Sequence, residues 1–333
     1  MYTEVIEQIR DRAKSDPKRI IFPEAEDDRV LKAVDYIRQE GIAEPLLFSS
    51  RNIDPSQRDQ FAYLLYEIRQ AKGMTYKKAK ELMDDPLFYA AMMLRCGLVD
   101  GMVAGASHST AAVMRAVLYC LELNDKIGVV TSCFLMGVPN CVFGEEGVLL
   151  YADCGVIPNP TSDQLARIAV SSAQFFQDVM DVTARVAMLS FSSKGSASGE
   201  LVDKVRNSVE LAKDLKKDFF IEGELQADSA LVPEVAAWKL NDSDVAGKAN
   251  VLIFPTLDAG NIGYKLTERL ANARAIGPII LGTIQPCSDL SRGCSVDDII
   301  ACTALTVIRA QKKFSNSRNI FINFDKHYAY IGI

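Results

Sequence analysis

Short apolar segments alternate with helical patterns along most of the chain. A helical periodicity in residues 5–13 precedes an apolar run at 19–23, and another helical pattern precedes a second run at 44–48. Further runs of strand length end in polar loops that lead into helical patterns, at 99–106, 186–191, 219–225 and 250–255. This alternation predicts an α/β fold with a mainly parallel sheet and its functional loops along one edge.

Two regions depart from the alternation. Residues 61–93 read as one helical region interrupted at Gly73. Apolar runs at 126–136 and 147–153 are joined by a short segment of turn-forming residues, which predicts an antiparallel pair of strands. Because the pair ends the regular alternation, we predict a domain change near residue 130.

We therefore expect two α/β domains with three layers, helices covering both faces of each sheet. The first comprises residues 1–130 and about 290–315, and the second, residues 131–289, is inserted into it. Residues 316–333 are polar and aromatic and fit neither pattern. We predict that they form a C-terminal tail, whose role the sequence does not define.

The strongest candidate for chemistry is the polar stretch 289–298. It follows an apolar run at 277–286, predicted to be a buried strand, and precedes a helical pattern beginning near residue 299. Open α/β sheets bind ligands in such loops. The stretch offers the Ser291 hydroxyl and the Arg292 guanidinium. An arginine suits the binding of an anion.

Carboxylates complete this stretch at Asp297 and Asp298, near the start of the following helix. An arginine and a carboxylate six residues apart suit a reaction that needs an anion clamp and a base. The alternative is structural: Ser295 caps the helix, and the two aspartates stabilise its positive N-terminal end.

A second strand-to-helix loop, residues 107–110, consists of small and hydroxyl-bearing residues before a helix at 111–121. Such a loop can cradle a phosphate on exposed backbone N–H groups. No GKS, GKT or G-x-G-x-x-G motif accompanies it, so the pattern is not that of a P-loop or a dinucleotide fingerprint.

Composition narrows the class of protein. An apolar fraction of 49% and a charged fraction of 24% are typical of a globular protein, and a net charge of −6 disfavours nucleic acid as a partner. The eight cysteines form no CxxC pair, and several lie in apolar runs, which predicts reduced thiols in a cytoplasmic protein. Two histidines disfavour a histidine-rich metal centre. No run is long enough to span a membrane, and no signal-peptide pattern is present.

Several segments, in this order, resemble the phosphate acetyltransferase family. The resemblance covers residues 1–314, and the segments that carry it are Val103–Ser109, Tyr151–Gly155, Ser192–Ser196, Glu222–Asp228, Phe254–Tyr264 and Leu290–Ser295. It implies two α/β domains with the active site in the cleft between them. It also implies a topology similar to that of the isocitrate and isopropylmalate dehydrogenases.

The resemblance implies reversible acetyl transfer between acetyl phosphate and coenzyme A, releasing inorganic phosphate, without a metal or a permanently bound cofactor. A homodimer is also implied. The family's Ser-Arg pair falls on Ser291 and Arg292, and its proposed base falls on Asp298. Its substrate-binding arginines fall on Arg269, Arg69 and Arg115.

In this mechanism Asp298 takes the proton of the coenzyme A thiol, and the thiolate attacks the acetyl carbonyl. Ser291 donates a hydrogen bond to the oxyanion, and Arg292 holds the phosphoryl group. An acyl-enzyme on Cys294 is the mechanistic alternative, because a cysteine two residues from an arginine can have a lowered pKa.

Three other functions fit parts of the pattern. A phosphate butyryltransferase would use the same chemistry with a wider acyl pocket. A metal- and nicotinamide-dependent dehydrogenase would need an aspartate cluster, for which only Asp228 and Asp258 are candidates. A non-catalytic acetyl-CoA sensor would lack turnover, but the presence of Ser291, Arg292 and Asp298 favours an enzyme.

Overall fold

The computed structural model describes residues 2–215, 218–239 and 242–316. Ten strands form one sheet in the order β2-β1-β3-β10-β9-β4-β5-β8-β6-β7. The strands are β1 (Arg19–Phe22), β2 (Glu44–Leu47), β3 (Gly101–Ala104), β4 (Thr131–Gly137), β5 (Val148–Ala152), β6 (Arg185–Leu189), β7 (Phe220–Leu225), β8 (Val251–Ile253), β9 (Arg274–Leu281) and β10 (Cys287–Asp289).

Helices connect most of these strands. They are α1 (Tyr2–Lys14), α2 (Asp28–Gln39), α3 (Pro55–Arg69), α4 (Tyr76–Leu82), α5 (Pro86–Arg95), α6 (Thr110–Cys120), α7 (Ser162–Met180), α8 (Glu200–Leu215), α9 (Ala227–Leu231), α10 (Pro233–Lys239), α11 (Leu257–Leu270) and α12 (Val296–Asn316), with short 3₁₀ turns at Ser50–Asn52 and Gln70–Lys72. Within the described ranges, no helix is both long and apolar enough to cross a membrane. The predicted tail beyond residue 316 lies outside the described residues.

The α/β fold with a mostly parallel sheet is confirmed, but the sheet has two directions. Pairing is parallel from β2 to β10 and from β5 to β7, whereas β10·β9, β9·β4 and β4·β5 are antiparallel. The two parallel groups therefore run in opposite directions. Their carboxyl ends lie at opposite edges of the sheet, so the expectation of functional loops along one edge is wrong.

The predicted antiparallel pair is confirmed as β4 and β5. The helical region predicted at 61–93 is instead part of three helices, because the chain turns twice. Gly73 adopts a left-handed conformation with φ of 84°, and Asp85 caps a new helix that begins at Pro86.

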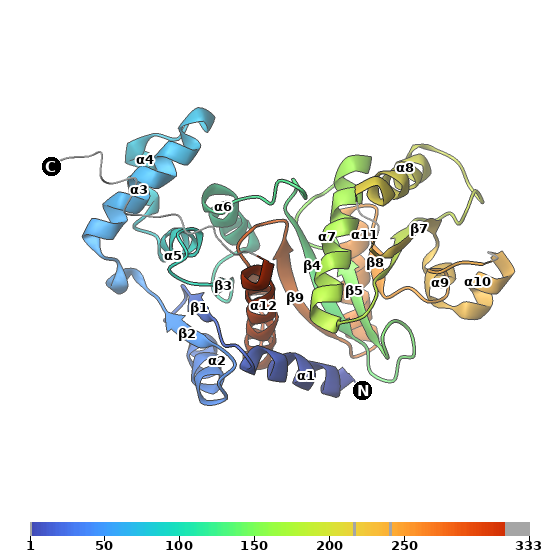
Figure 1. Cartoon of the computed structure of the whole chain (residues 1–333), viewed down its shortest axis with the longest axis horizontal. Helices are drawn as coiled ribbons and strands as arrows, with labels where there is room; N and C mark the ends of the chain where they lie inside the picture. Colours follow the sequence, from blue (N-terminus) through green and yellow to red (C-terminus); the bar gives the residue numbers. More distant parts are fainter. Residues whose placement is uncertain (1, 216–217, 240–241, 317–333) are drawn as a thin grey trace.

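The two faces of the sheet are packed differently. On the face of α1, α2, α7, α8 and α12, one continuous core extends from Ile20 of β1 to Ile221 of β7. On the other face, one core lies under α3–α6 and another under α9–α11. In Figure 1, α7 and α12 lie in front of the sheet and α11 lies behind it. The face covered by α3–α6 and α9–α11 therefore has a break between these two groups of helices.

The carboxyl ends of β3 and β10 meet at a close backbone contact. Gly105 follows β3 with φ of 109°, and Leu290 donates a backbone hydrogen bond of 2.6 Å to Ala104. A Cβ atom at Gly105 would lie 2.3 Å from Asp289 Oδ1 and 2.5 Å from the Leu290 carbonyl oxygen. Only glycine fits this position without a shift of the chain that follows β10.

We therefore expect Gly105→Ala to destabilise the fold by about 3 kcal/mol, from left-handed strain and overpacking together. Gly97→Ala is the matched control, because Gly97 also has a positive φ of 73° but nothing lies within 4 Å of the position that its new methyl group would take. It should cost only about 1 kcal/mol. Denaturant unfolding measures both variants, and equal losses would contradict the close contact.

Candidate active site

A cavity of about 830 Å³ lies over the sheet at the break between the packed helices. Its walls come from the start of α6, from β4 and β9, from α11, and from the turn that follows β10. It brings together four of the six predicted site residues, Ser291, Arg292, Arg269 and Asp298. The cavity therefore gathers most of the predicted site residues on one surface.

Residues 291–294 form a tight turn after β10. The Cys294 N–H donates to the Ser291 carbonyl at 2.8 Å, and the Gly293 N–H approaches Ser291 Oγ at 3.3 Å. The strand predicted at 277–286 is instead β9, which ends at Leu281, and the separate strand β10 leads into the turn. The prediction of a loop between a strand's carboxyl end and a helix is confirmed, although the strand is a different one.

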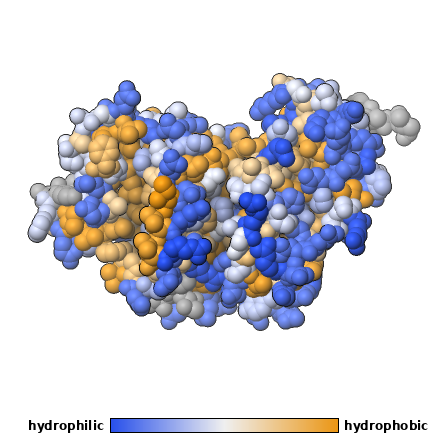
Figure 2. All heavy atoms as spheres, turned by 180° about the vertical axis from the view of Figure 1, so that it is seen from behind, coloured by the Kyte–Doolittle hydropathy of each residue, from blue (hydrophilic) through white to orange (hydrophobic). Residues whose placement is uncertain are grey.

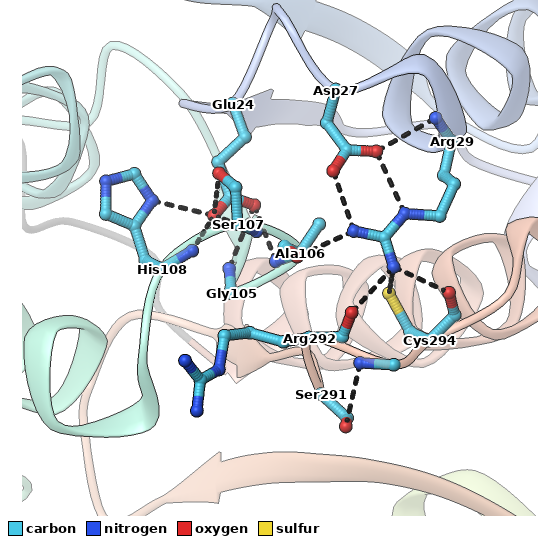
Figure 3. Close-up of polar contacts among 11 residues, drawn as sticks. Glu24, Asp27, Arg29, Gly105, Ala106, Ser107, His108, Ser291, Arg292 and Cys294 are labelled. Carbon is cyan, nitrogen blue, oxygen red and sulfur yellow. Dashed lines mark hydrogen bonds and ion pairs between the residues drawn. The ribbon is translucent and has the colours of Figure 1, made fainter.

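Arg292 and Arg269 provide positive charge in this cavity. Both line its wall, and the Arg269 side chain is 81% exposed beside Glu268 at 3.6 Å. Figure 3 shows the Arg292 guanidinium directed away from the neighbouring polar network. Two solvated guanidinium groups on one wall suit the binding of a phosphate or another small anion.

Asp298 serves the local structure as well as lining the cavity. Ser295 donates to Asp298 Oδ2 from its backbone N–H at 2.9 Å and from its hydroxyl at 2.8 Å. The Asp298 N–H donates back to Ser295 Oγ at 3.2 Å, and Arg274 Nε lies 3.3 Å from Asp298 Oδ1. Ser295 thus caps the helix, as the structural alternative predicted, and Asp298 takes part in this cap through Oδ2 and not through Oδ1.

Arg69 and Arg115 do not line the cavity. Arg69 Nη1 donates to the Leu118 carbonyl at 3.3 Å, and its guanidinium lies 4.8 Å from the centre of the Tyr119 ring. Arg115 is exposed on α6. Arg69, at the end of α3, thus packs beside the C-terminal part of α6, whereas the start of α6 is the end that lines the cavity.

In the predicted phosphate cradle at 107–110, the N–H groups of Ser107 and His108 are already used by a carboxylate. Glu24 is 5% exposed and accepts backbone hydrogen bonds from residues 105–108 at 2.8–3.0 Å. His108 Nδ1 lies 2.7 Å from the same carboxylate. Burial acts to raise the pKa of Glu24, but the hydrogen bonds from His108 and the loop outweigh it and lower the pKa.

Arg29 is a second residue that the sequence interpretation missed. Its guanidinium contacts Asp27, the Ala106 carbonyl, and the Arg292 and Cys294 carbonyls (Figure 3). Glu24 and Arg29 lie in and just after the polar loop that follows β1. Since β1 pairs in parallel with β3, their position after a strand's carboxyl end was the available signal.

Cys294 does not have the lowered pKa that an acyl-enzyme would require. It is 6% exposed, and burial raises the pKa of its thiol to about 11, although Arg29 acts in the opposite direction. Arg29 is itself paired with Asp27 at 2.7 Å. Near neutral pH the thiol is protonated, which disfavours the covalent route.

Asp289 is a buried carboxyl group directly before the turn. It is 1% exposed, and neither oxygen has a hydrogen bond of normal geometry within the described part of the chain. Burial raises its pKa from 3.8 to about 7, with the Thr110 side chain acting in the opposite direction and the charge of Glu24 adding to the rise. This group titrates near neutral pH, unlike an ordinary aspartate.

Fold and cavity together describe an α/β protein whose cavity carries two arginines of a kind suited to an anionic ligand. A family model described as phosphate acetyl/butaryl transferase matches residues 4–307. The phosphate acetyltransferase of Acetivibrio thermocellus is 47% identical over 325 residues, covering 92% of this chain and 98% of that protein. That of Clostridium acetobutylicum is 47% identical over 330 residues, covering 93% and 99%.

A solved structure gives the same result. The chain is similar to a phosphotransacetylase from Streptococcus pyogenes, with a TM-score of 0.86 and 35% identity over 93% of this chain and 99% of that one. The chain belongs to the phosphate acetyl/butaryl transferase family. The resemblance inferred from the sequence motifs is confirmed.

The raised pKa of Asp289 predicts a dependence of stability on pH. Between pH 3.8 and about 7 the folded state holds a proton that the unfolded state has lost. Wild-type stability should therefore fall as pH rises through this window, by at most about 1.4 kcal/mol per pH unit, and the loss should be complete above pH 7. Asp289→Asn removes this term.

Thermal unfolding between pH 4.5 and 8 measures the effect. The stability of Asp289→Asn relative to wild type should increase as pH rises and level off above pH 7. Asp35→Asn is the control, because the Asp35 side chain is 69% exposed. Parallel curves for wild type and Asp289→Asn would contradict the assignment.

Proposed function

We propose that this chain is a phosphate acetyltransferase, which transfers an acetyl group reversibly between acetyl phosphate and coenzyme A. The observation that carries the proposal is the placement of Ser291, Arg292 and Asp298 on the wall of one cavity. The activity named for the relatives from Acetivibrio thermocellus and Clostridium acetobutylicum supports it. We propose coenzyme A as a substrate, with no cofactor retained between turnovers.

The chemistry proceeds by direct attack in a ternary complex. A thiol of pKa about 8.5 is mostly protonated at neutral pH, so a base is needed to form the thiolate. Asp298 takes the thiol proton through Oδ1, because Oδ2 accepts two hydrogen bonds from Ser295 at 2.9 and 2.8 Å, whereas Oδ1 has the longer contact of 3.3 Å to Arg274 Nε. The sulfur then forms a bond to the acetyl carbon.

As this bond forms, negative charge develops on the carbonyl oxygen. The Ser291 hydroxyl donates a hydrogen bond to that oxygen, an interaction whose removal typically costs about 3 kcal/mol of barrier. The carbon–oxygen bond to phosphate then breaks, and the phosphate leaves with the bonding electron pair. Arg292 binds this phosphate and stabilises its added charge.

The other arginines serve coenzyme A in this proposal. Arg269 lies on the cavity wall, where it meets a phosphate of the incoming coenzyme. Arg115 on α6 and Arg69 at the end of α3 lie outside the cavity. We assign both to the more distant phosphates of the same coenzyme A molecule. The exposure of Arg115 supports this assignment.

We also propose the two-domain division drawn from the sequence. β2, β1 and β3 come from residues 1–130 and form one parallel group with β10, which at Cys287–Asp289 lies just before the predicted boundary near 290. The remaining strands come from residues 131–289. The break between the two helix cores on one face supports a cleft between domains. An arrangement like that of the isocitrate and isopropylmalate dehydrogenases is part of this proposal. The eight unpaired cysteines support a cytoplasmic location.

A homodimer is the proposed assembly. Ile262, Leu266 and Leu270 follow one another on α11 at a spacing of four residues and are 57%, 53% and 81% exposed. Hydrophobic patches are visible in Figure 2, which shows the molecule from the side opposite to that of Figure 1. An apolar helix face of this kind favours burial against a second copy.

The dimer is tested by light scattering on the wild type and on Leu266→Glu combined with Leu270→Glu. The double variant should be monomeric, because two charges would have to be buried in the interface. Leu201→Glu is the control, since Leu201 is 59% exposed on another helix. A dimer that survives the double substitution would refute this interface.

The base role predicts that Asp298→Asn lowers kcat by about 100-fold or more. The asparagine oxygen can still accept from Ser295, so the helix start is retained. Ser295→Ala is the matched control: it removes the cap hydroxyl, keeps the carboxylate and should retain most activity. Thioester absorbance with acetyl phosphate and coenzyme A, in the presence of a chelator, measures turnover.

An active Asp298→Asn enzyme would remove the base assignment, and a wild type without thioester formation would overturn the proposed function. The same assay with butyryl phosphate compares kcat/KM between the acyl groups. We expect acetyl phosphate to be preferred. A preference for butyryl phosphate would indicate a butyryltransferase.

A further inference from the structure

We propose that Arg29 is a positioning residue, which holds the Ser291–Cys294 turn in the geometry needed for acyl transfer. The inference rests on the proposed function of that turn. Arg29 lies near the start of α2, about 260 residues before the turn in sequence, and none of the roles assigned above includes it. Figure 3 shows it between the loop after β1, the loop after β3 and the turn after β10.

Every N–H group of the Arg29 guanidinium has an acceptor. Nε and Nη2 donate to the two oxygens of Asp27 at 3.1 and 2.7 Å, and Nη2 also donates to the Ala106 carbonyl at 2.7 Å. Nη1 donates to the carbonyls of Arg292 and Cys294 at 2.8 and 3.0 Å. A guanidinium has five N–H donors, and five acceptors surround this one.

The turn depends on such external contacts. Its internal hydrogen bonds are the one from Cys294 N–H to the Ser291 carbonyl and the longer one from Gly293 to Ser291 Oγ. Ser291, Arg292 and Gly293 are exposed, and Gly293 adds backbone freedom. Because Arg29 binds the carbonyls on both sides of Gly293, it restricts the backbone that carries the Arg292 side chain.

The position of Arg29 is itself determined by the fold. Asp27 caps α2 by accepting the Arg29 N–H at 2.9 Å, and its two oxygens also orient the guanidinium. The Ala106 carbonyl belongs to the loop that Glu24 holds through four backbone N–H groups. The turn is thus connected to α2 and to the β3 loop through one planar group.

This arrangement separates positioning from substrate binding. With its N–H groups engaged, Arg29 has no donor left for a phosphate, whereas Arg292 presents its guanidinium to the cavity. Lysine cannot replace Arg29, because one compact ammonium group does not reproduce a planar set of five donors. The role of Arg29 therefore requires the planar geometry of the guanidinium, and a positive charge alone does not fulfil it.

The test compares Arg29→Lys with Arg38→Lys in the full-length protein. Arg38 is also on α2, but its side chain is 57% exposed and its ion pair with Asp35 is 3.5 Å long. We expect Arg29→Lys to lower kcat by about 10- to 100-fold, because small displacements of reacting groups have effects of this size. The KM for coenzyme A should stay within about twofold, and Arg38→Lys should match wild type.

Asp27→Asn is the second variant and keeps the test decisive if Arg29→Lys does not fold. It keeps Arg29 but weakens its orientation, so it should lower kcat in the same direction and by less, again with the KM for coenzyme A unchanged. Thermal unfolding of each variant reports the folded fraction, to which kcat is normalised.

An unchanged kcat in folded Arg29→Lys, or in Asp27→Asn where Arg29→Lys does not fold, would overturn the inference. So would a rise in the KM for coenzyme A at constant kcat, which would make Arg29 a binding residue. A kcat loss explained by the unfolded fraction would reduce Arg29 to a structural role. Absence of thioester formation by wild type would instead refute the proposed function, so the two failures are distinguishable.

Discussion

The site depends on the buried carboxylate of Glu24, which holds the loop after β3 beside the cavity. Glu24 accepts the N–H groups of residues 105–108, and those of the buried residues Gly105 and Ala106 would otherwise lack partners at considerable cost. The same arrangement recurs in the loops that follow β5 and β6. Asp153 accepts from the N–H groups of Gly155, Val156 and Ile157, and Glu224 accepts from Gly195 and the Ser192 hydroxyl. Internal carboxylates therefore hold three loops of this protein in place.

Pairing with carboxylates explains which arginines are engaged in the framework and which face the cavity. Arg206 is paired with Glu224, and Arg29 is paired with Asp27, so both serve the framework. On the cavity wall, Arg292 faces open space from a turn that the framework holds at both ends. The turn that carries Arg292 has two internal hydrogen bonds, from Cys294 N–H to the Ser291 carbonyl and from Gly293 N–H to Ser291 Oγ. Rigid surroundings and a short, anchored turn are what a reaction that stabilises developing charge requires.

The sequence predicted the elements better than their arrangement. Apolar runs located nearly all strands, and the polar turn at 291–294 was recognised because serine, arginine and glycine follow a strand. The opposite directions of the two parallel groups were not predictable, since they depend on the pairing of β9 with β4 and of β10 with β3, strands that lie far apart in sequence. Glu24 and Arg29 were missed for a related reason. Each acts on backbone atoms contributed by distant segments, and local sequence patterns do not reveal such partners.

The central claim is that the turn after β10 holds an acyl phosphate in this cavity while Asp298 faces the incoming thiol. A crystal structure of the protein with coenzyme A and inorganic phosphate tests it most directly. The account predicts phosphate oxygens within hydrogen-bonding distance of the Arg292 guanidinium, and the coenzyme sulfur on the side of Asp298 Oδ1. Phosphate bound elsewhere, with Arg292 in solvent and the sulfur remote from Asp298, would contradict it.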